Sequence, residues 1–314
     1  MVSLLGGIFL GWSLGANDAS NVFGAAVASR MLKFWTAAIL ASVFVLVGAV
    51  VSGQAGIETL KGLTRLDLEQ AIISSVAAAI TVTIMTILGL PVSTSQSVVG
   101  AILGIGILNN QLNLSGLVKV VACWIGTPVG GAITGILAYY ALGAIYNRMA
   151  LNLFDSDMLL RTCLVIAGSY GAYTLGANNV ANVTAVFVGA ELIGILSAAL
   201  IGGASIALGI LTFSRPVMET VGRKLVRLDP FSSLVVVLSM GITTHVYTLI
   251  GVPVSTSQAV VGGVLGVGIV KGVNTVSRKT LYNIILAWCL TPVVACFFSL
   301  AISFLLHLRY MPPN

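Results

Sequence analysis

The chain has 314 residues, of which 58% are hydrophobic and only 8% are charged, and its mean hydropathy is +1.07. A soluble globular protein carries roughly 25% charged residues, so this chain has too few to cover a surface that faces water. The net charge of +6 comes from basic residues scattered between apolar runs, which excludes the clustered basic face of a nucleic-acid-binding domain. The composition therefore predicts an all-α polytopic membrane protein embedded in a lipid bilayer, with about 20 apolar residues per crossing.

The first half of the chain predicts five apolar elements in order. A first span lies within Met1–Ser29 and carries the polar motif GANDASN, residues 15–21. Second and third spans follow at 34–53 and 71–90. The segment PVSTSQ, residues 91–96, then interrupts the chain, and a short apolar piece and a last long span come after it.

The same elements recur in the second half. GANNVAN begins 161 residues after GANDASN, and a second PVSTSQ begins at Pro253, 162 residues after the first. A third landmark, Trp-x-x-Thr-Pro, occurs at 124–128 and again at 288–292, and we expect its Thr-Pro pairs to kink helices where they pack. Three landmarks in the same order indicate an internal duplication.

The duplication predicts two transmembrane repeats, residues 1–150 and 162–314, joined by a short cytoplasmic connection at 151–161. If each third span and its short piece return to the side they came from, each repeat makes an odd number of net crossings. The result is two inverted-topology repeats with broken and re-entrant helices. Because Lys and Arg collect on the cytoplasmic side, both termini are predicted outside the cytoplasmic membrane. The predicted inside loops hold 11 of the 15 basic residues: Arg30, Lys33, Arg148, Arg161, Arg215, Arg223, Lys224, Arg227, Lys271, Arg278 and Lys279.

The GAN motifs predict a polar centre within the first span of each half. The span within Met1–Ser29 is long for one straight crossing, and Asn and Asp compete with backbone hydrogen bonds, so we expect the helix to unwind at the motif. Asp18 is the one acid well inside a span, and its repeat counterpart is Asn179. A bound cation would explain the carboxylate, since hard cations prefer oxygen ligands; a protonated or hydrogen-bonded structural Asp is the alternative.

The PVSTSQ segments predict two helix N-termini. Pro91 favours the first turn of a new helix, and the Ser and Thr residues that follow suit an N-cap. Free backbone N–H groups at a helix N-terminus form an anion site, and two such sites from opposite sides suit a small tetrahedral oxyanion. One copy alone is more typical of a proline kink at which Ser and Thr side chains hold helices together. Two copies at matching positions indicate a transporter site.

These motifs resemble those of the PiT family of inorganic phosphate transporters, over essentially the whole chain. The resemblance implies two inverted repeats and cation-coupled symport. It implies phosphate as the substrate, held by hydroxyl and amide side chains, and sodium at the acid and the remaining asparagines. The residues implied for phosphate are Ser93, Thr94, Ser95, Gln96, Ser255, Thr256, Ser257, Gln258, Asn17 and Asn178. Those implied for sodium are Asp18, Asn21, Asn179 and Asn182.

The expected function is secondary active import of phosphate across the cytoplasmic membrane, coupled to sodium. Proton coupling is the alternative cation, and an anion channel is the alternative class of protein. No G-x-x-x-x-G-K-[ST] motif is present, so ATP is not predicted to drive transport. We expect neither an enzyme nor a resident cofactor, because the spans carry no plausible nucleophile with a base; sodium would be a transported ligand. A homo-oligomer is left open.

Overall fold

The computed structural model describes residues 2–63, 66–87, 92–110, 112–224, 228–272 and 278–309, and these form helices and turns without a strand. A single 3-10 turn, η1 (Val2–Leu4), precedes the first long helix. The helices of the first half are α1 (Leu5–Ala28), α2 (Phe34–Ser52), α3 (Gln54–Lys61), α4 (Leu68–Ile87), α5 (Thr94–Leu108) and α6 (Leu114–Arg148). Those of the second half are α7 (Leu153–Gly189), α8 (Ile195–Lys224), α9 (Pro230–Leu249), α10 (Thr256–Lys271) and α11 (Arg278–Arg309).

Seven of the described helices, α2, α4, α6, α7, α8, α9 and α11, are long and apolar enough to cross a bilayer. The helices that follow the two PVSTSQ segments, α5 and α10, are apolar but shorter than a full crossing. The all-α, multi-pass membrane fold predicted from composition is therefore confirmed.

The GAN motifs lie inside continuous helices, so the predicted unwinding is wrong. GANDASN is part of α1 and GANNVAN is part of α7. The 37 residues of α7 span about 55 Å at 1.5 Å per residue, and a tilted helix that projects beyond the hydrocarbon accommodates that length. The Asn side chains of the motifs bond to other segments, as described below, so they do not compete with their own helix backbone.

Two other boundaries differ from the sequence prediction. The predicted connection at 151–161 is mostly helical, because α7 begins at Leu153 with Asn152 as its N-cap. The stretch between the second and third predicted spans contains the helix α3. The division into repeats at 1–150 and 162–314 stays a prediction. The first helix of the second half, α7, begins at Leu153, before the predicted start of the second repeat.

The two halves pack together through contacts between helices of one half and helices of the other, and the contacts come in equivalent pairs. Helix α1 lies on α8 and α2 lies on α7, while α5 packs on α11 and α6 packs on α10. Glycines make the closest of these approaches: a Cβ on Gly15 would lie 1.9 Å from the carbonyl oxygen of Ile206, and one on Gly209 would lie 2.0 Å from that of Trp12. The equivalent glycines of the other pair, Gly48 and Gly176, meet Tyr173 and Val45 in the same way.

The turns of the two halves repeat in backbone conformation. Arg30 and Glu191 end the first turn of each half and have positive φ angles of 61° and 55°. Asn110 and Gly272 follow the two short helices and have positive φ angles of 54° and 63°. Because a non-glycine residue rarely adopts positive φ, its recurrence at matching positions supports a duplicated fold.

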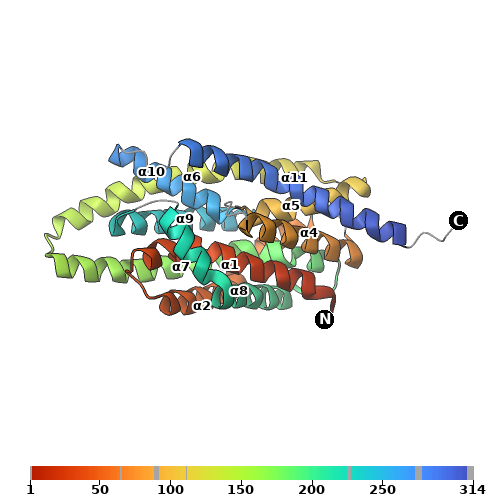
Figure 1. Cartoon of the computed structure of the whole chain (residues 1–314), viewed down its shortest axis with the longest axis horizontal. Coiled ribbons are helices and arrows are strands. Elements are labelled where there is room, and N and C mark those ends of the chain that lie inside the picture. Colours follow the sequence, from red (N-terminus) through yellow and green to blue (C-terminus); the bar gives the residue numbers. More distant parts are fainter. Residues whose placement is uncertain are drawn as a thin grey trace.

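Two helical hairpins, α4–α5 and α9–α10, open toward opposite ends of the molecule (Figure 1). The base of α4–α5 lies at the start of α6, where the Asn113 N–H donates to the Leu63 carbonyl oxygen at 3.0 Å. The base of α9–α10 lies at the end of α6, where the rings of Tyr146 and Phe231 are 5.4 Å apart. The hairpin tips therefore point toward each other near the middle of the molecule.

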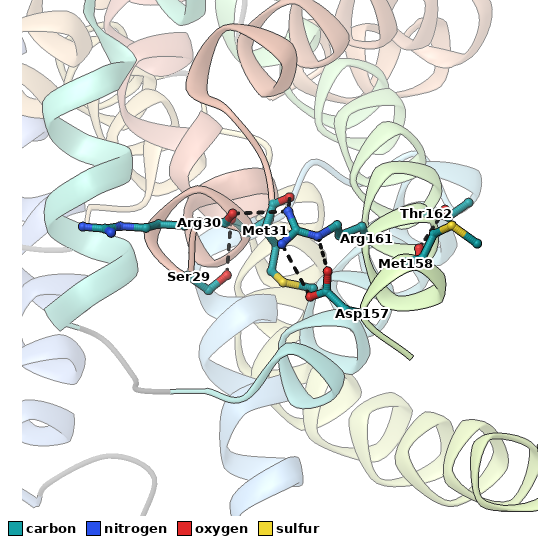
Figure 2. A network of polar contacts seen from close by, with 8 residues as sticks. Ser29, Arg30, Met31, Asp157, Met158, Arg161 and Thr162 are labelled. Atoms are coloured by element: carbon teal, nitrogen blue, oxygen red, sulfur yellow. Dashed lines mark hydrogen bonds and ion pairs between the residues drawn. The ribbon is translucent and has the colours of Figure 1, made fainter. Parts of the chain in front are cut away.

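Basic residues gather at the end where α6 turns into α7. There Arg161 of α7 donates to the carbonyl oxygen of Met31 at 2.6 Å and forms an ion pair with Asp157, which ties the α1–α2 turn to the second half (Figure 2). The guanidinium of Arg215 lies 5.7 Å from the ring centre of Phe34 at the same end. The start of α1 and the end of α11 lie at the other end (Figure 1). Which end faces the cytoplasm stays a prediction.

We predict that Gly15→Ala and Gly176→Ala destabilise the protein by about 1–3 kcal/mol each, the usual cost of overpacking. The added methyl group would lie about 2 Å from a backbone carbonyl oxygen of the facing helix, so the helices must separate. The control is Gly143→Ala in α6, where the nearest atom is 3.8 Å away and alanine is the better helix former. Thermal unfolding in detergent is the measurement, and equal midpoints for all three variants would contradict the prediction.

Candidate functional site

The tips of the two hairpins are capped helix N-termini. The Ser93 hydroxyl oxygen accepts a hydrogen bond from the Gln96 N–H at 3.3 Å, and the Ser255 hydroxyl accepts from the Gln258 N–H at the same distance. These bonds confirm the predicted N-caps of α5 and α10. Pro253 lies two residues before its cap and not in the first helical turn as predicted. Pro91 lies outside the described residues.

Each tip is tied to the extended segment of the other half. The Ser95 hydroxyl donates to the Val254 carbonyl oxygen at 3.0 Å, and the Ser257 hydroxyl donates to the Val92 carbonyl oxygen at 3.3 Å. The two bonds are equivalent: in each, the same serine of one half donates to the same valine carbonyl of the other half. The N-termini of α5 and α10 are therefore brought together at one place in the protein interior.

The GAN motifs reach across to the PVSTSQ segments. Asn21 of α1 donates to the hydroxyl oxygen of Ser257 at 3.1 Å, and Asn182 of α7 donates to that of Ser95 at 3.0 Å. The buried carboxylate of Asp18 accepts a hydrogen bond from the Thr256 hydroxyl at 3.0 Å. Its counterpart Asn179 accepts from Asn182 at 2.8 Å. Residues predicted to bind the cation and residues predicted to bind the anion thus form one polar cluster.

Several atoms of this cluster have no hydrogen-bond partner among the described residues. Buried polar groups in proteins are almost always paired, and leaving one unpaired costs about 1–3 kcal/mol. Five such atoms lie in the predicted site, on side chains that are at most 5% exposed. They are Thr94 Oγ1, Gln96 Oε1, Asn179 Nδ2, Asn182 Oδ1 and Gln258 Oε1. A concentration of unpaired donors and acceptors at one place is what a site for a polar ligand requires.

The remaining predicted residues, Asn17 and Asn178, are equivalent in sequence but differ in their contacts. The Asn178 side chain donates to the Val254 carbonyl oxygen at 2.7 Å and accepts from the Val254 N–H at 3.1 Å. Asn17 donates to the Thr86 hydroxyl oxygen at 2.9 Å and is partly exposed. One extended segment is therefore clamped by its GAN motif, while the pair equivalent to this clamp, Asn17 and Val92, is not bonded in that way.

The charge of the site is limited to one carboxylate. Asp18 is the acid in the polar cluster, and no group of three or more His, Cys, Asp or Glu residues occurs in the described part of the chain. A cation here would be held by that carboxylate together with hydroxyl, amide and carbonyl oxygens. Oxygen-only ligands suit a hard cation, and a single negative charge balances a monovalent ion.

The sequence prediction missed Thr86 and the backbone of Val254 as members of the site. Thr86 recurs as Thr248, 162 residues later, so the repeat itself carried this signal. The role of Val254 could not be found in the same way, because its carbonyl and N–H groups are common to all residues and only the packed structure places them beside Asn178.

Comparison with known proteins finds a family, two similar sequences and a similar solved structure. The sequence model described as the phosphate transporter family matches residues 14–299. The chain is 30% identical to a candidate phosphate permease of Methanocaldococcus jannaschii, covering 96% of both chains, and 29% identical to a sulfate permease of Bacillus subtilis, covering 98% of this chain and 86% of that one. A solved structure of a sodium-dependent phosphate transporter matches with a TM-score of 0.87, 25% identity and 98% coverage of both chains.

We predict that Asn178→Ala destabilises the protein more than Asn17→Ala. The first change leaves the buried N–H group of Val254 unpaired and removes one of the two hydrogen bonds to its carbonyl oxygen, at a cost of about 2 kcal/mol or more. The second removes one bond at a partly exposed position. Thermal unfolding of the two variants in detergent provides the comparison, and an equal loss of stability would show that the clamp is not stronger than its counterpart.

Proposed function

Because the chain belongs to the phosphate transporter family, we propose that it is a secondary active transporter that imports inorganic phosphate together with sodium. The observation that carries the proposal is the meeting of two capped helix N-termini beside the buried carboxylate of Asp18. The N-termini supply N–H and hydroxyl donors for an oxyanion, and the carboxylate supplies the ligand for a cation. The sodium dependence of the structural neighbour supports the choice of ion.

The proposal assigns the oxyanion to the Ser, Thr and Gln side chains of both PVSTSQ segments, Ser93 to Gln96 and Ser255 to Gln258. Sodium is assigned to Asp18 with the amides of Asn21, Asn179 and Asn182. Thr256 bonds to both Asp18 and Asn21, so it adjoins both ligands. Asn17 and Asn178 hold Thr86 and Val254 in this structure, and their direct contact with phosphate stays a prediction.

Coupling follows from the charges at the site. An ionised Asp18 beside a phosphate would repel it, and a cation bound between the two removes the repulsion. Moving a divalent phosphate into a negative cell costs about 2.3 kcal/mol per charge for each 100 mV, or roughly 4.6 kcal/mol in total. Two sodium ions cancel this cost and a third makes the membrane potential drive uptake, so cotransport serves both the site and the membrane step.

We predict that Asp18→Asn lowers sodium-dependent phosphate uptake at least tenfold. An amide oxygen can still accept the Thr256 hydrogen bond, and asparagine already occupies the equivalent position, Asn179. The fold should therefore persist while the negative ligand for the cation is lost. Uptake of labelled phosphate into proteoliposomes, with imposed sodium gradients, is the measurement.

The control for that experiment is Glu69→Gln, which neutralises an exposed carboxylate at the start of α4 and should transport like the wild type. If Asp18→Asn retains wild-type uptake with the same sodium dependence, the assignment of Asp18 to the cation is wrong. If the wild type instead responds to a proton gradient in sodium-free buffer, proton coupling replaces sodium in the proposal.

Sulfate is a second candidate substrate, because the relative from Bacillus subtilis is a sulfate permease and sulfate is also a tetrahedral oxyanion. The two ions differ in one property: phosphate near neutral pH carries a hydroxyl that donates a hydrogen bond, and sulfate carries none. The cluster contains the carboxylate of Asp18 and the unpaired side-chain oxygen of Asn182, both of which accept. Acceptors in the site favour phosphate.

We predict that sulfate in tenfold excess inhibits labelled phosphate uptake by less than half. A sulfate ion in the same position would leave an acceptor without a donor, which costs about 1–3 kcal/mol, and about 1.4 kcal/mol is enough to weaken binding tenfold. Competition assays in proteoliposomes measure this directly. If sulfate competes as well as unlabelled phosphate does, the site accepts tetrahedral oxyanions in general and is not specific for phosphate.

A further inference from the structure

The Trp-x-x-Thr-Pro motifs contain two buried indoles whose N–H groups are unpaired. Trp124 of α6 and Trp288 of α11 are each 9% exposed, and neither Nε1 has a hydrogen-bond partner among the described residues. A buried indole N–H normally finds a partner, and even that of the partly exposed Trp12 donates to the Thr212 hydroxyl oxygen at 2.8 Å. Two unpaired indoles at equivalent positions in both halves indicate a shared role beyond packing.

The register of two helix pairs places these tryptophans at the level of the site along their helices. Helices α5 and α11 run in the same direction in close contact, since Gly100 packs on the carbonyl of Pro292 and Gly104 on that of Cys296. One turn earlier on each helix, Gln96 is level with Trp288, because both lie four residues before the contact at Gly100 and Pro292.

The equivalent pair, α10 and α6, has the same register. Gly262 packs on the carbonyl of Pro128 and Gly266 on that of Ala132, so Gln258 is level with Trp124. Each glutamine also carries a buried side-chain oxygen without a partner. An unpaired donor and an unpaired acceptor therefore lie at the same level in both halves.

The proline of each motif loosens the helix at this level. Pro292 has no N–H, so the carbonyl of Trp288, four residues earlier, lacks its helical partner. The Thr291 hydroxyl instead donates to the Ala287 carbonyl oxygen at 2.6 Å, and Thr127 makes the equivalent bond to Cys123. The turn that carries the tryptophan therefore has one backbone hydrogen bond fewer than a regular helix.

We propose that Trp124 and Trp288 are positioning residues for the oxyanion, and that each indole N–H holds the side-chain oxygen of the level glutamine, Trp288 for Gln96 and Trp124 for Gln258. An amide whose oxygen is held in this way presents its NH2 group, and an oxyanion requires donors. The hydrogen bond from the indole to the glutamine forms when the anion accepts from the glutamine NH2 group. In that orientation the side-chain oxygen is turned toward the indole N–H, so the two groups that are unpaired in this structure pair with each other. The inference rests on the proposed function only in that an oxyanion occupies the site.

The direct test is the indole N–H signal in the NMR spectrum of the full-length protein in detergent. The chain has four tryptophans, so the spectrum contains four such signals, each assigned by a Trp→Phe variant. We expect added inorganic phosphate to shift the signals of Trp124 and Trp288 and to leave that of the exposed Trp35 in place. In Gln96→Ala the phosphate-induced shift of Trp288 should disappear while that of Trp124 persists, and Gln258→Ala should give the reverse.

Binding measurements provide the second test. Trp288→Phe keeps the ring and removes the N–H, and it should weaken phosphate binding about tenfold, as the loss of one hydrogen bond to a buried group predicts. The same change should have no further effect in the Gln96→Ala background, yet act in full in the Gln258→Ala background. The matched control, Trp12→Phe, removes an indole N–H that is paired elsewhere and should bind phosphate normally.

Two results would overturn the inference. One is that Trp288→Phe and Gln96→Ala weaken phosphate binding independently of each other. The other is that the phosphate-induced shift of the Trp288 indole signal is unchanged in Gln96→Ala. A failure of the proposed substrate looks different. If the wild type shows no response to phosphate but responds to sulfate, the same glutamine variants are tested with sulfate as the probe. Selective loss of the Trp288 response in Gln96→Ala would then support the pairing without phosphate.

Discussion

A helix that begins inside an apolar interior exposes backbone N–H groups at its N-terminus, and neither lipid nor apolar side chains can satisfy them. Two helices of this chain, α5 and α10, begin in that way. Each is capped by its own serine and tied to the extended segment of the opposite half through Ser95 or Ser257. Each half in turn satisfies a backbone carbonyl group of the other, because the carbonyl oxygens of Val254 and Val92 accept from serine hydroxyls of the opposite half. The polar cluster at the centre is therefore a consequence of how the two halves satisfy each other's backbone.

The GAN motifs serve this arrangement with two different kinds of residue. Their glycines, Gly15 and Gly176, let the helices of opposite halves approach until the backbones touch. Asn21 and Asn182, six residues further along the same helices, then reach the segment that this close approach has brought near. Close packing and polar recognition are thus encoded within seven residues of continuous helix.

The sequence was most informative where the duplication reinforced a local rule. Two identical PVSTSQ segments predicted two helix N-termini, and the caps at Ser93 and Ser255 agree. It was misleading where local propensity was read without tertiary partners: Asn and Asp weaken an isolated helix, yet in α1 and α7 the glycine contacts and cross-half hydrogen bonds keep the motif helical. Positions such as Thr86 gain their meaning from packing, and composition alone does not distinguish them from other polar residues within the spans.

The two halves are alike in backbone but unlike in charge and clamping. The equivalent of the acidic Asp18 is the neutral Asn179. Asn178 forms two hydrogen bonds with the backbone of Val254, whereas Asn17 donates to Thr86. A perfectly symmetric site would offer two equal carboxylates and two equal clamps, and nothing would favour one orientation of the bound ligands. Because the sole carboxylate of the polar cluster is bonded to Thr256, a cation drawn to it lies nearer the second PVSTSQ segment than the first. Under the proposed assignment, the cation therefore lies nearer the second half, while unpaired groups remain for the anion on both segments, at Thr94, Gln96 and Gln258.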